Sequence, residues 1–216
     1  TSTTKIVDPA TEFAGRRALV TGGTRGIGRA ISDRLRAGGA TVLAMARSLP
    51  ADQPSESVIV ADIASPAGTD AVVQAVAQRL GGIDIVVHNA GITRDKKLAN
   101  MSADKWNPVL AVNLIAPELI TRELLATKTL NAGGRIVGVS SFSGFAGNAG
   151  QTNYATTKAG VIGLVDSLRD ELPEGVTINA VAPGFIETKM TASMPLGPRE
   201  VGRRLNSLSQ GGQPVD

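Results

Sequence analysis

Short apolar segments alternate with helical segments along most of this chain, and that alternation restricts the possible folds more than any other feature. The apolar segments are continuous runs, which is typical of strands covered on both faces of a parallel sheet. The runs predicted as strands are 17–21, 41–46, 57–61, 83–88, 135–140 and 176–181. Helical spacing of apolar residues predicts helices over 27–37, 70–80, 102–126 and 152–172. We therefore expect an α/β fold, a doubly wound parallel sheet of the Rossmann type in three αβα layers.

The second crossover and the end of the chain depart from this regular pattern. Residues 47–56 are polar and contain two prolines, so no helix is expected there. Nothing resembling a linker or a repeat interrupts the chain, and residues 1–216 are expected to form a single domain. Segment 210–216 is typical of the approach to another helix, and no seventh strand follows it.

The composition excludes several classes of protein. The chain has no cysteine and only one histidine, so disulfides and thiolate metal sites are excluded and no metal site is expected. No apolar run reaches the roughly 18 residues of a membrane helix, and the polar N-terminus lacks the apolar core of a signal peptide. The net charge is +3, but the basic residues form no stripe and aromatic residues are few, which disfavours nucleic-acid binding. These features predict a cytoplasmic protein.

A glycine-rich turn, Thr-Gly-Gly-Thr-Arg-Gly-Ile-Gly over 21–28, joins the first predicted strand to the first predicted helix. Glycines allow a tight turn and let a pyrophosphate approach the backbone, while the helix N-terminus offers free N–H groups. The turn therefore indicates a dinucleotide site. Its predicted contacts are Gly22, Thr24, Arg25, Gly26, Ile27 and Gly28.

The end of the second strand indicates which dinucleotide is bound. A carboxylate there would accept a hydrogen bond from the ribose 2′-hydroxyl and repel a 2′-phosphate. This chain has Ala46 followed by Arg47, and Arg25 lies in the glycine turn near the same ribose. Guanidinium groups suit phosphate oxygens, so the sequence predicts NADPH/NADP as the cofactor.

Tyr154 and Lys158 lie four residues apart in a predicted helix and share one face of it. A free tyrosine has a pKa of about 10, and a nearby ammonium is expected to lower that pKa by stabilising the phenolate. Such a tyrosine can donate a proton to a carbonyl oxygen as hydride reaches the carbon. A serine that holds the oxygen would follow the fifth strand, where Ser140, Ser141 and Ser143 are all candidates.

Five motifs in this order resemble the short-chain dehydrogenase/reductase family: the glycine turn, Asp62-Ile63, His88-Asn-Ala-Gly-Ile92, Tyr154-x-x-x-Lys158 and the segment from Pro183 to Thr188. The resemblance implies that both Tyr154 and Lys158 also touch the cofactor. The other contacts that it implies are Asp62, Ile63, Asn89, Ala90, Gly91, Pro183, Gly184, Ile186 and Thr188.

The same resemblance completes the predicted catalytic set. The family places its serine thirteen residues before the tyrosine, which selects Ser141. It also uses an asparagine, here Asn113, to help hold a water that relays protons through the lysine. An asparagine is mildly unfavourable inside a helix, which is a separate reason to expect a function for Asn113. His88, the only histidine, is interpreted as a satisfied structural group.

Segments 91–95, 147–154 and 183–190 are similar to those of bacterial 3-oxoacyl-(acyl-carrier-protein) reductases. The resemblance implies reduction of a 3-oxoacyl thioester to the 3-hydroxyacyl form in fatty acid biosynthesis, with an acidic acyl carrier protein or coenzyme A as the thioester carrier. Residues 189–210, including Met190, Met194, Pro195 and Leu196, would form a mobile apolar lid. Alternatives are a reductase of another small ketone, a sugar or a quinone, and a non-catalytic NADP(H) sensor or scaffold.

Two further expectations follow from the resemblance. The family carries a last helix and a final strand after the position of Asp216, so we expect the sheet of this chain to lack its last strand. In the family the helices that correspond to 102–126 and 152–172 pack across a two-fold axis, which implies a homo-oligomer, either a dimer or a tetramer.

Overall fold

Six parallel strands form one sheet in the computed structural model, which describes residues 8–192, 196–206 and 210–216. The strand order is β3-β2-β1-β4-β5-β6, which is the order of a doubly wound sheet. The strands are β1 (Arg17–Thr21), β2 (Thr41–Ala46), β3 (Val58–Val60), β4 (Ile83–His88), β5 (Leu130–Val139) and β6 (Thr177–Val181). The order reverses between β1 and β4, and ligands of such sheets bind where these two strands end.

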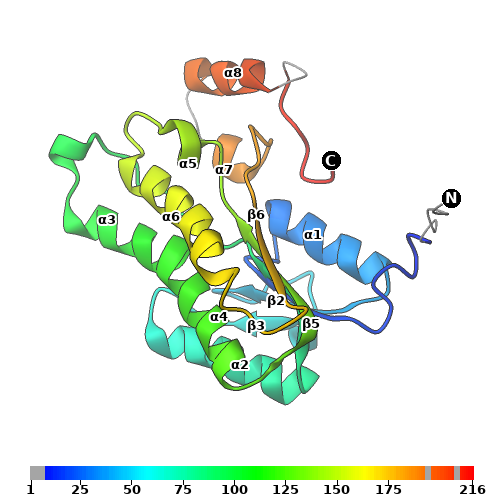
Figure 1. Ribbon diagram of the computed structural model, residues 1–216. Helices are drawn as coiled ribbons and strands as arrows, with labels where there is room; N and C mark the ends of the chain where they lie inside the picture. The colour runs from blue at the N-terminus through cyan, green and yellow to red at the C-terminus, as the bar shows by residue number, and fades with distance from the viewer. Residues whose placement is uncertain (1–7, 193–195, 207–209) are drawn as a thin grey trace, which may run out of the picture.

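Helices cover the two faces of the sheet unequally. The helices are α1 (Gly26–Ala37), α2 (Pro66–Leu80), α3 (Ala103–Leu110), α4 (Ala116–Ala126), α5 (Ser143–Ala146), α6 (Thr152–Leu168), α7 (Lys189–Ala192) and α8 (Leu196–Leu205). One face packs against α2, α4 and α6 and carries the larger apolar core, while α1 covers the other face over β1 and β2 (Figure 1). The predicted three-layer αβα architecture is confirmed. No described helix is both long and apolar enough to span a membrane.

Two helix boundaries differ from the prediction for local reasons. Helix α2 begins at Pro66, four residues early, because the Ser65 side chain accepts a hydrogen bond from the Gly68 N–H at 3.2 Å and proline suits the first helical position. Helix α6 ends at Leu168 instead of residue 172. Acidic residues at 170 and 171 oppose the helix dipole there, and Pro173 disfavours helical geometry in the residue before it.

The predicted helix over 102–126 contains a wider turn in its middle. Between α3 and α4 the segment η3 (Ala111–Ile115) is a π-helix that includes Asn113. Pro117 has no N–H and cannot donate to the Asn113 carbonyl four residues earlier, so the regular ladder is interrupted at this point. Such π-turns often occur at functional sites.

The last segment, 210–216, is predicted to approach another helix, and it is not itself helical. Its backbone instead pairs with the segment after β6: the Gly212 N–H donates to the Phe185 carbonyl at 3.0 Å, and the Glu187 N–H donates to the Gly212 carbonyl at 2.8 Å. Figure 1 shows α5, α7 and α8 gathered at the same end of the molecule, where β5 and β6 end.

Candidate active site

The glycine turn after β1 has a shape that only glycine permits. Gly22 has a φ of +65°, and a Cβ on it would lie 3.0 Å from the Ala90 Cα. A Cβ on Gly28 would lie 2.2 Å from the Gly22 carbonyl oxygen. Helix α1 then begins with no side-chain cap from Arg25 and no acidic residue in its first turn, so its free N–H groups suit an anion. This cradle fits the pyrophosphate of a dinucleotide.

Thr21 and Asn89 lock this turn to the end of β4. The Asn89 amide donates to the carbonyls of Thr21 and Gly22 at 3.0 and 3.3 Å. The Thr21 hydroxyl oxygen accepts from the N–H groups of Asn89 and Ala90, both at 3.0 Å. Asn89 therefore shapes the turn. Thr21, which was not among the predicted contacts, is buried and fixes the turn to the end of β4 through its hydroxyl. A short polar side chain at the end of an apolar strand was the available signal.

The residues predicted to face the adenosine half of the cofactor lie at the carboxyl ends of β2 and β3 and, for Arg25, in the glycine turn before helix α1. Arg47 and Arg25 are exposed, and neither forms an ion pair within the described parts of the chain. Asp62 is exposed and accepts a hydrogen bond from the Ala64 N–H at 3.0 Å, whereas Ile63 is buried. Gln53, in the short crossover, donates to the Thr24 carbonyl at 3.0 Å and so ties that crossover to the glycine turn.

The three candidate serines occupy different environments. Ser140 is buried, and its hydroxyl donates to the Lys158 carbonyl at 2.7 Å, which turns it towards helix α6. Ser143 begins helix α5. The Ser141 hydroxyl accepts from the Ser143 N–H at 3.2 Å, and Ser141 also acts to lower the pKa of the nearby Tyr154 hydroxyl, which favours the ionised phenol. The structure thus brings Ser141 to the tyrosine, as the family resemblance implied.

Lys158 lies almost entirely inside the protein, with an exposed fraction of 4%. Its ammonium donates to the Val139 carbonyl at 2.6 Å and lies 5.6 Å from the centre of the Tyr154 ring. Burial lowers the pKa of Lys158 to about 8, because the charged form loses its hydration.

The expectation that the pKa of Tyr154 is lowered is wrong. Burial raises the pKa of Tyr154, Ser141 only partly opposes this, and Asp95 adds to the rise. A lowered pKa would be expected if both groups were solvated. In the folded chain, the loss of hydration raises the pKa of the phenol more than Ser141 lowers it, so Tyr154 remains protonated at neutral pH.

Asn113 is buried in the π-turn, and its side chain is bonded on every side. Its amide oxygen accepts from the Ile92 N–H at 2.8 Å, and its amide nitrogen donates to the Ile92 carbonyl at 3.0 Å and the Thr157 hydroxyl at 3.1 Å. A Cβ on Gly91 would lie 3.6 Å from both the Asn113 amide oxygen and the Lys158 ammonium. Gly91, Asn113 and Lys158 therefore line one small region beside Tyr154.

His88 is buried at the end of β4, on the side of helix α4. Its Nε2 lies 2.9 Å from the Thr121 hydroxyl, while its Nδ1 is buried and has no hydrogen-bond partner among the described residues. The interpretation as a satisfied structural group therefore holds for one ring nitrogen only. Burial lowers the pKa of His88 to about 4, so the ring is neutral under ordinary conditions.

We expect His88 to make the fold sensitive to mild acid. The unfolded chain takes up a proton below the ordinary pKa of 6.5 and the folded chain only near pH 4, so stability is lost as the pH falls between these values. A shift of this size corresponds to about 3 kcal/mol. Because the chain has a single histidine, NMR can measure the pKa of His88 directly. The stability of His88→Asn over the same pH range shows how much of the loss comes from titrating carboxylates. An NMR pKa near the ordinary value would contradict this prediction.

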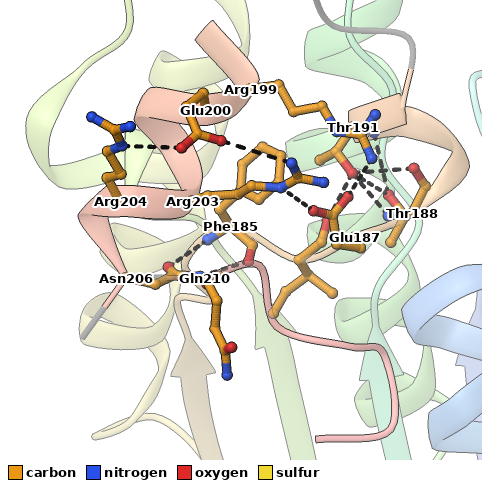
Figure 2. A network of polar contacts seen from close by, with 11 residues as sticks. Phe185, Glu187, Thr188, Thr191, Arg199, Glu200, Arg203, Arg204, Asn206 and Gln210 are labelled. Carbon is orange, nitrogen blue, oxygen red and sulfur yellow. Dashed lines mark hydrogen bonds and ion pairs between the residues drawn. The ribbon is translucent and has the colours of Figure 1, made fainter. Parts of the chain in front are cut away.

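The segment after β6 carries the remaining predicted cofactor contacts and anchors helix α8. The Thr188 methyl group lies 3.8 Å from the position of a Cβ on Gly26, which places this segment beside the glycine turn. Figure 2 shows Glu187 between Arg199 and Arg203, with ion pairs of 2.8 and 2.6 Å. The Asn206 amide accepts from the Phe185 N–H at 2.9 Å and donates to the Phe185 carbonyl at 2.8 Å.

These contacts revise the expected lid. Part of segment 189–210 is helical and is held to the segment after β6 by polar bonds (Figure 2). The two arginines, Arg203 first, lower the pKa of Glu187 and keep it ionised. Met194 and Pro195 lie outside the described residues, and the side chains of Met190 and Leu196 are not described either. Pro183, Gly184 and Ile186 lead from β6 into this network. Among the described residues no group of acidic or histidine side chains could hold a metal ion.

Comparison with known proteins places this arrangement in a family. The model of the short chain dehydrogenase family matches residues 16–197. The chain is 44% identical over 197 residues to the 3-oxoacyl-(acyl-carrier-protein) reductase FabG of Aquifex aeolicus, covering 84% of this chain and 78% of that protein. It is 40% identical over 190 residues to FabG of Escherichia coli strain K12, with the same coverage of 84% and 78%.

A solved structure shares the fold over nearly the whole chain. The angucycline C-6 ketoreductase LanV, solved with bound NADP, superposes with a TM-score of 0.85 at 27% sequence identity, covering 94% of this chain and 86% of LanV. One family assignment follows from the sheet order, the glycine turn, the Tyr154–Lys158 pair and these relatives. The chain belongs to the short-chain dehydrogenase family and is a nicotinamide-dependent oxidoreductase similar to the 3-oxoacyl-(acyl-carrier-protein) reductases.

Proposed function

We propose that this protein uses NADPH to reduce a ketone to a secondary alcohol, and that its substrate is a 3-oxoacyl thioester. The observation that carries the proposal is the convergence of Ser141, Tyr154, Lys158 and Asn113 beside the glycine turn. A binding protein without catalytic activity would not need a buried lysine next to a partly buried phenol, because removing both groups from water costs stability.

The proposed chemistry assigns one task to each side chain. The cofactor, when bound, supplies the hydride. The Ser141 hydroxyl holds the substrate carbonyl oxygen, and the Tyr154 hydroxyl donates the proton to that oxygen as the alcohol forms. Because burial keeps Tyr154 protonated, its resting form is the acid that a reduction requires. Lys158 borders the phenol and can return a proton to it, and Asn113 holds the backbone of Ile92 on the other side.

The preference for NADPH rests on charge at the end of β2. Arg47 and Arg25 are exposed and are not engaged by carboxylates within the described residues, so both are available to a 2′-phosphate. No carboxylate occupies the position of Ala46, where it would repel that phosphate. LanV, which was solved with NADP, supports the same choice.

We expect Ala46→Asp to move the cofactor preference from NADPH towards NADH. The new carboxylate would accept hydrogen bonds from a free ribose hydroxyl and repel a phosphate, and one such repulsion amounts to about a ten-fold change or more in the kcat/KM ratio. The measurement is kcat/KM for both cofactors in the parent and the variant, with Ala46→Ser as an uncharged control. Equal kcat/KM values for the two cofactors in the parent would refute the NADPH assignment.

The substrate class rests on the relatives and on an apolar rim next to Ser141. The two similar FabG proteins are 3-oxoacyl-(acyl-carrier-protein) reductases. Phe142 and Phe145 follow this serine in the chain and are 55% and 69% exposed, which is unusual for aromatic side chains and suits an acyl chain. The carrier of the thioester would be an acidic acyl carrier protein or coenzyme A.

Loss of NADPH absorbance with acetoacetyl-CoA, an acetoacetyl carrier protein, a cyclic ketone and a quinone tests the proposal. We expect the thioesters to have the highest kcat/KM. Faster reduction of the cyclic ketone or the quinone would show that the substrate is another ketone or a quinone and not a thioester. NADPH binding without oxidation by any of these compounds would instead identify a sensor or scaffold.

A further inference from the structure

Asn153, the residue before Tyr154, is fully buried in the first turn of helix α6. Its amide nitrogen donates to the Arg94 carbonyl at 2.9 Å and to the Lys105 carbonyl at 3.0 Å. Its amide oxygen accepts from the Tyr154 N–H at 2.8 Å. The side chain therefore joins three segments: the loop after β4, helix α3 and the start of helix α6.

The Tyr154 N–H would otherwise lack a partner. It lies in the first turn of α6, where backbone donors have no carbonyl within the helix, and Gln151 at the N-cap provides no side-chain bond. The Asn153 amide takes the role that a capping residue usually has. A buried asparagine inside a helix is unfavourable by propensity and by desolvation, so its three bonds are what offsets that cost.

Thr157 makes a second connection one turn later. It is also fully buried, and its hydroxyl donates to the Tyr154 carbonyl at 2.8 Å. The same hydroxyl accepts from the Asn113 amide at 3.1 Å. A continuous chain of hydrogen bonds thus runs from the Ile92 backbone through Asn113 and Thr157 to the backbone of Tyr154.

We infer that Asn153 and Thr157 are positioning residues that fix the Tyr154 turn between the Asn113 π-turn and the loop after β4. Neither side chain is placed in contact with the substrate or the reacting atoms. They act by holding the backbone from which the Tyr154 ring projects, on both sides of that residue. This inference rests on the proposed function for its kinetic part, because it takes Tyr154 to be the proton donor.

The chain offers a probe of Tyr154 that does not depend on activity. Tyr154 is the only tyrosine, so the near-ultraviolet absorbance of tyrosinate reports its ionisation alone. The groups that shift the pKa of its hydroxyl are Ser141 after β5 and Asp95 on the loop after β4. The Lys158 ammonium, on the same helix, faces its ring at 5.6 Å from the centre. These side chains remain in every variant used below.

The central experiment compares Thr157→Val with the parent protein. Valine keeps the shape of threonine and removes both hydrogen bonds. We expect the tyrosinate titration to move down towards about pH 10, because a looser turn admits water to the phenol. We also expect kcat to fall about ten-fold while the dissociation constant for NADPH is unchanged. Thr157→Ser, which keeps the hydroxyl, should restore both values.

Matched variants separate this role from general damage to the helix. Thr156 is exposed on the same turn, and Thr156→Val should leave both the titration and kcat as in the parent. Asn153→Ala should move the titration in the same direction as Thr157→Val. A titration that is the same in Thr157→Val, Asn153→Ala and the parent would overturn the inference. If the parent reduced no carbonyl compound, the proposed function would fail, and the titration would still decide the positioning role.

Discussion

Replacing Tyr154 with phenylalanine is expected to lower kcat by about two orders of magnitude or more, which is the usual scale of acid catalysis. The change removes only the hydroxyl near Ser141 and leaves the ring beside Lys158. The glycine turn and the segment after β6 are untouched, so the dissociation constant for NADPH should stay close to that of the parent. Steady-state kinetics and a fluorescence titration with NADPH provide the two measurements.

Ser143→Ala is the matched control for this experiment, because Ser143 lies close in sequence to Ser141 but begins helix α5. We expect it to retain kcat within a factor of about two, because alanine keeps the backbone N–H of residue 143, which donates to the Ser141 hydroxyl at 3.2 Å. Turnover near the parent value in Tyr154→Phe would remove Tyr154 from the proposed mechanism. Loss of NADPH binding in the same variant would show that the hydroxyl serves the cofactor and not the proton transfer.

Lys158→Met is expected to change activity and stability in opposite directions. Activity should fall by about a hundred-fold, because the buried ammonium beside Tyr154 is lost. Stability at pH 7 should rise, because burial lowers the pKa of Lys158 to about 8 and the charged form is the costly one. Removing the buried charge should therefore raise the free energy of unfolding by about 3 kcal/mol. Loss of the hydrogen bond to the Val139 carbonyl should cancel about half of this gain.

The pH dependence of this gain has a definite sign. The unfolded lysine is protonated below its ordinary pKa of 10.5 and the folded lysine only below about 8. The free-energy cost of burying the charged lysine is therefore full below pH 8 and disappears as the pH rises to 10.5. The difference in stability between the methionine variant and the parent should shrink over that range. Urea unfolding of both proteins at pH 7 and pH 10 measures it. A methionine variant less stable than the parent at pH 7 would contradict the argument.

The sequence by itself determined the features that depend on local physics. Continuous apolar runs placed β1, β2 and β4 at their observed bounds, and the alternation of strands and helices predicted that the sheet is parallel. The glycine turn was recognisable because φ and close approach restrict Gly22 and Gly28 to one residue type. Tyr154 and Lys158 share a helix face through helical periodicity alone. These properties reside within a few neighbouring residues, so a linear pattern contains them.

The tertiary structure decided everything that depends on burial or on residues distant in sequence. It separated Ser140 from Ser141 by turning the first towards helix α6, and it introduced the π-turn at Asn113. It reversed the expected pKa shift of Tyr154, because desolvation depends on how the whole fold excludes water. It also supplied Asn153 and Thr157 with partners 44 to 59 residues away. Such partners meet only after the chain has folded, and no local pattern specifies them.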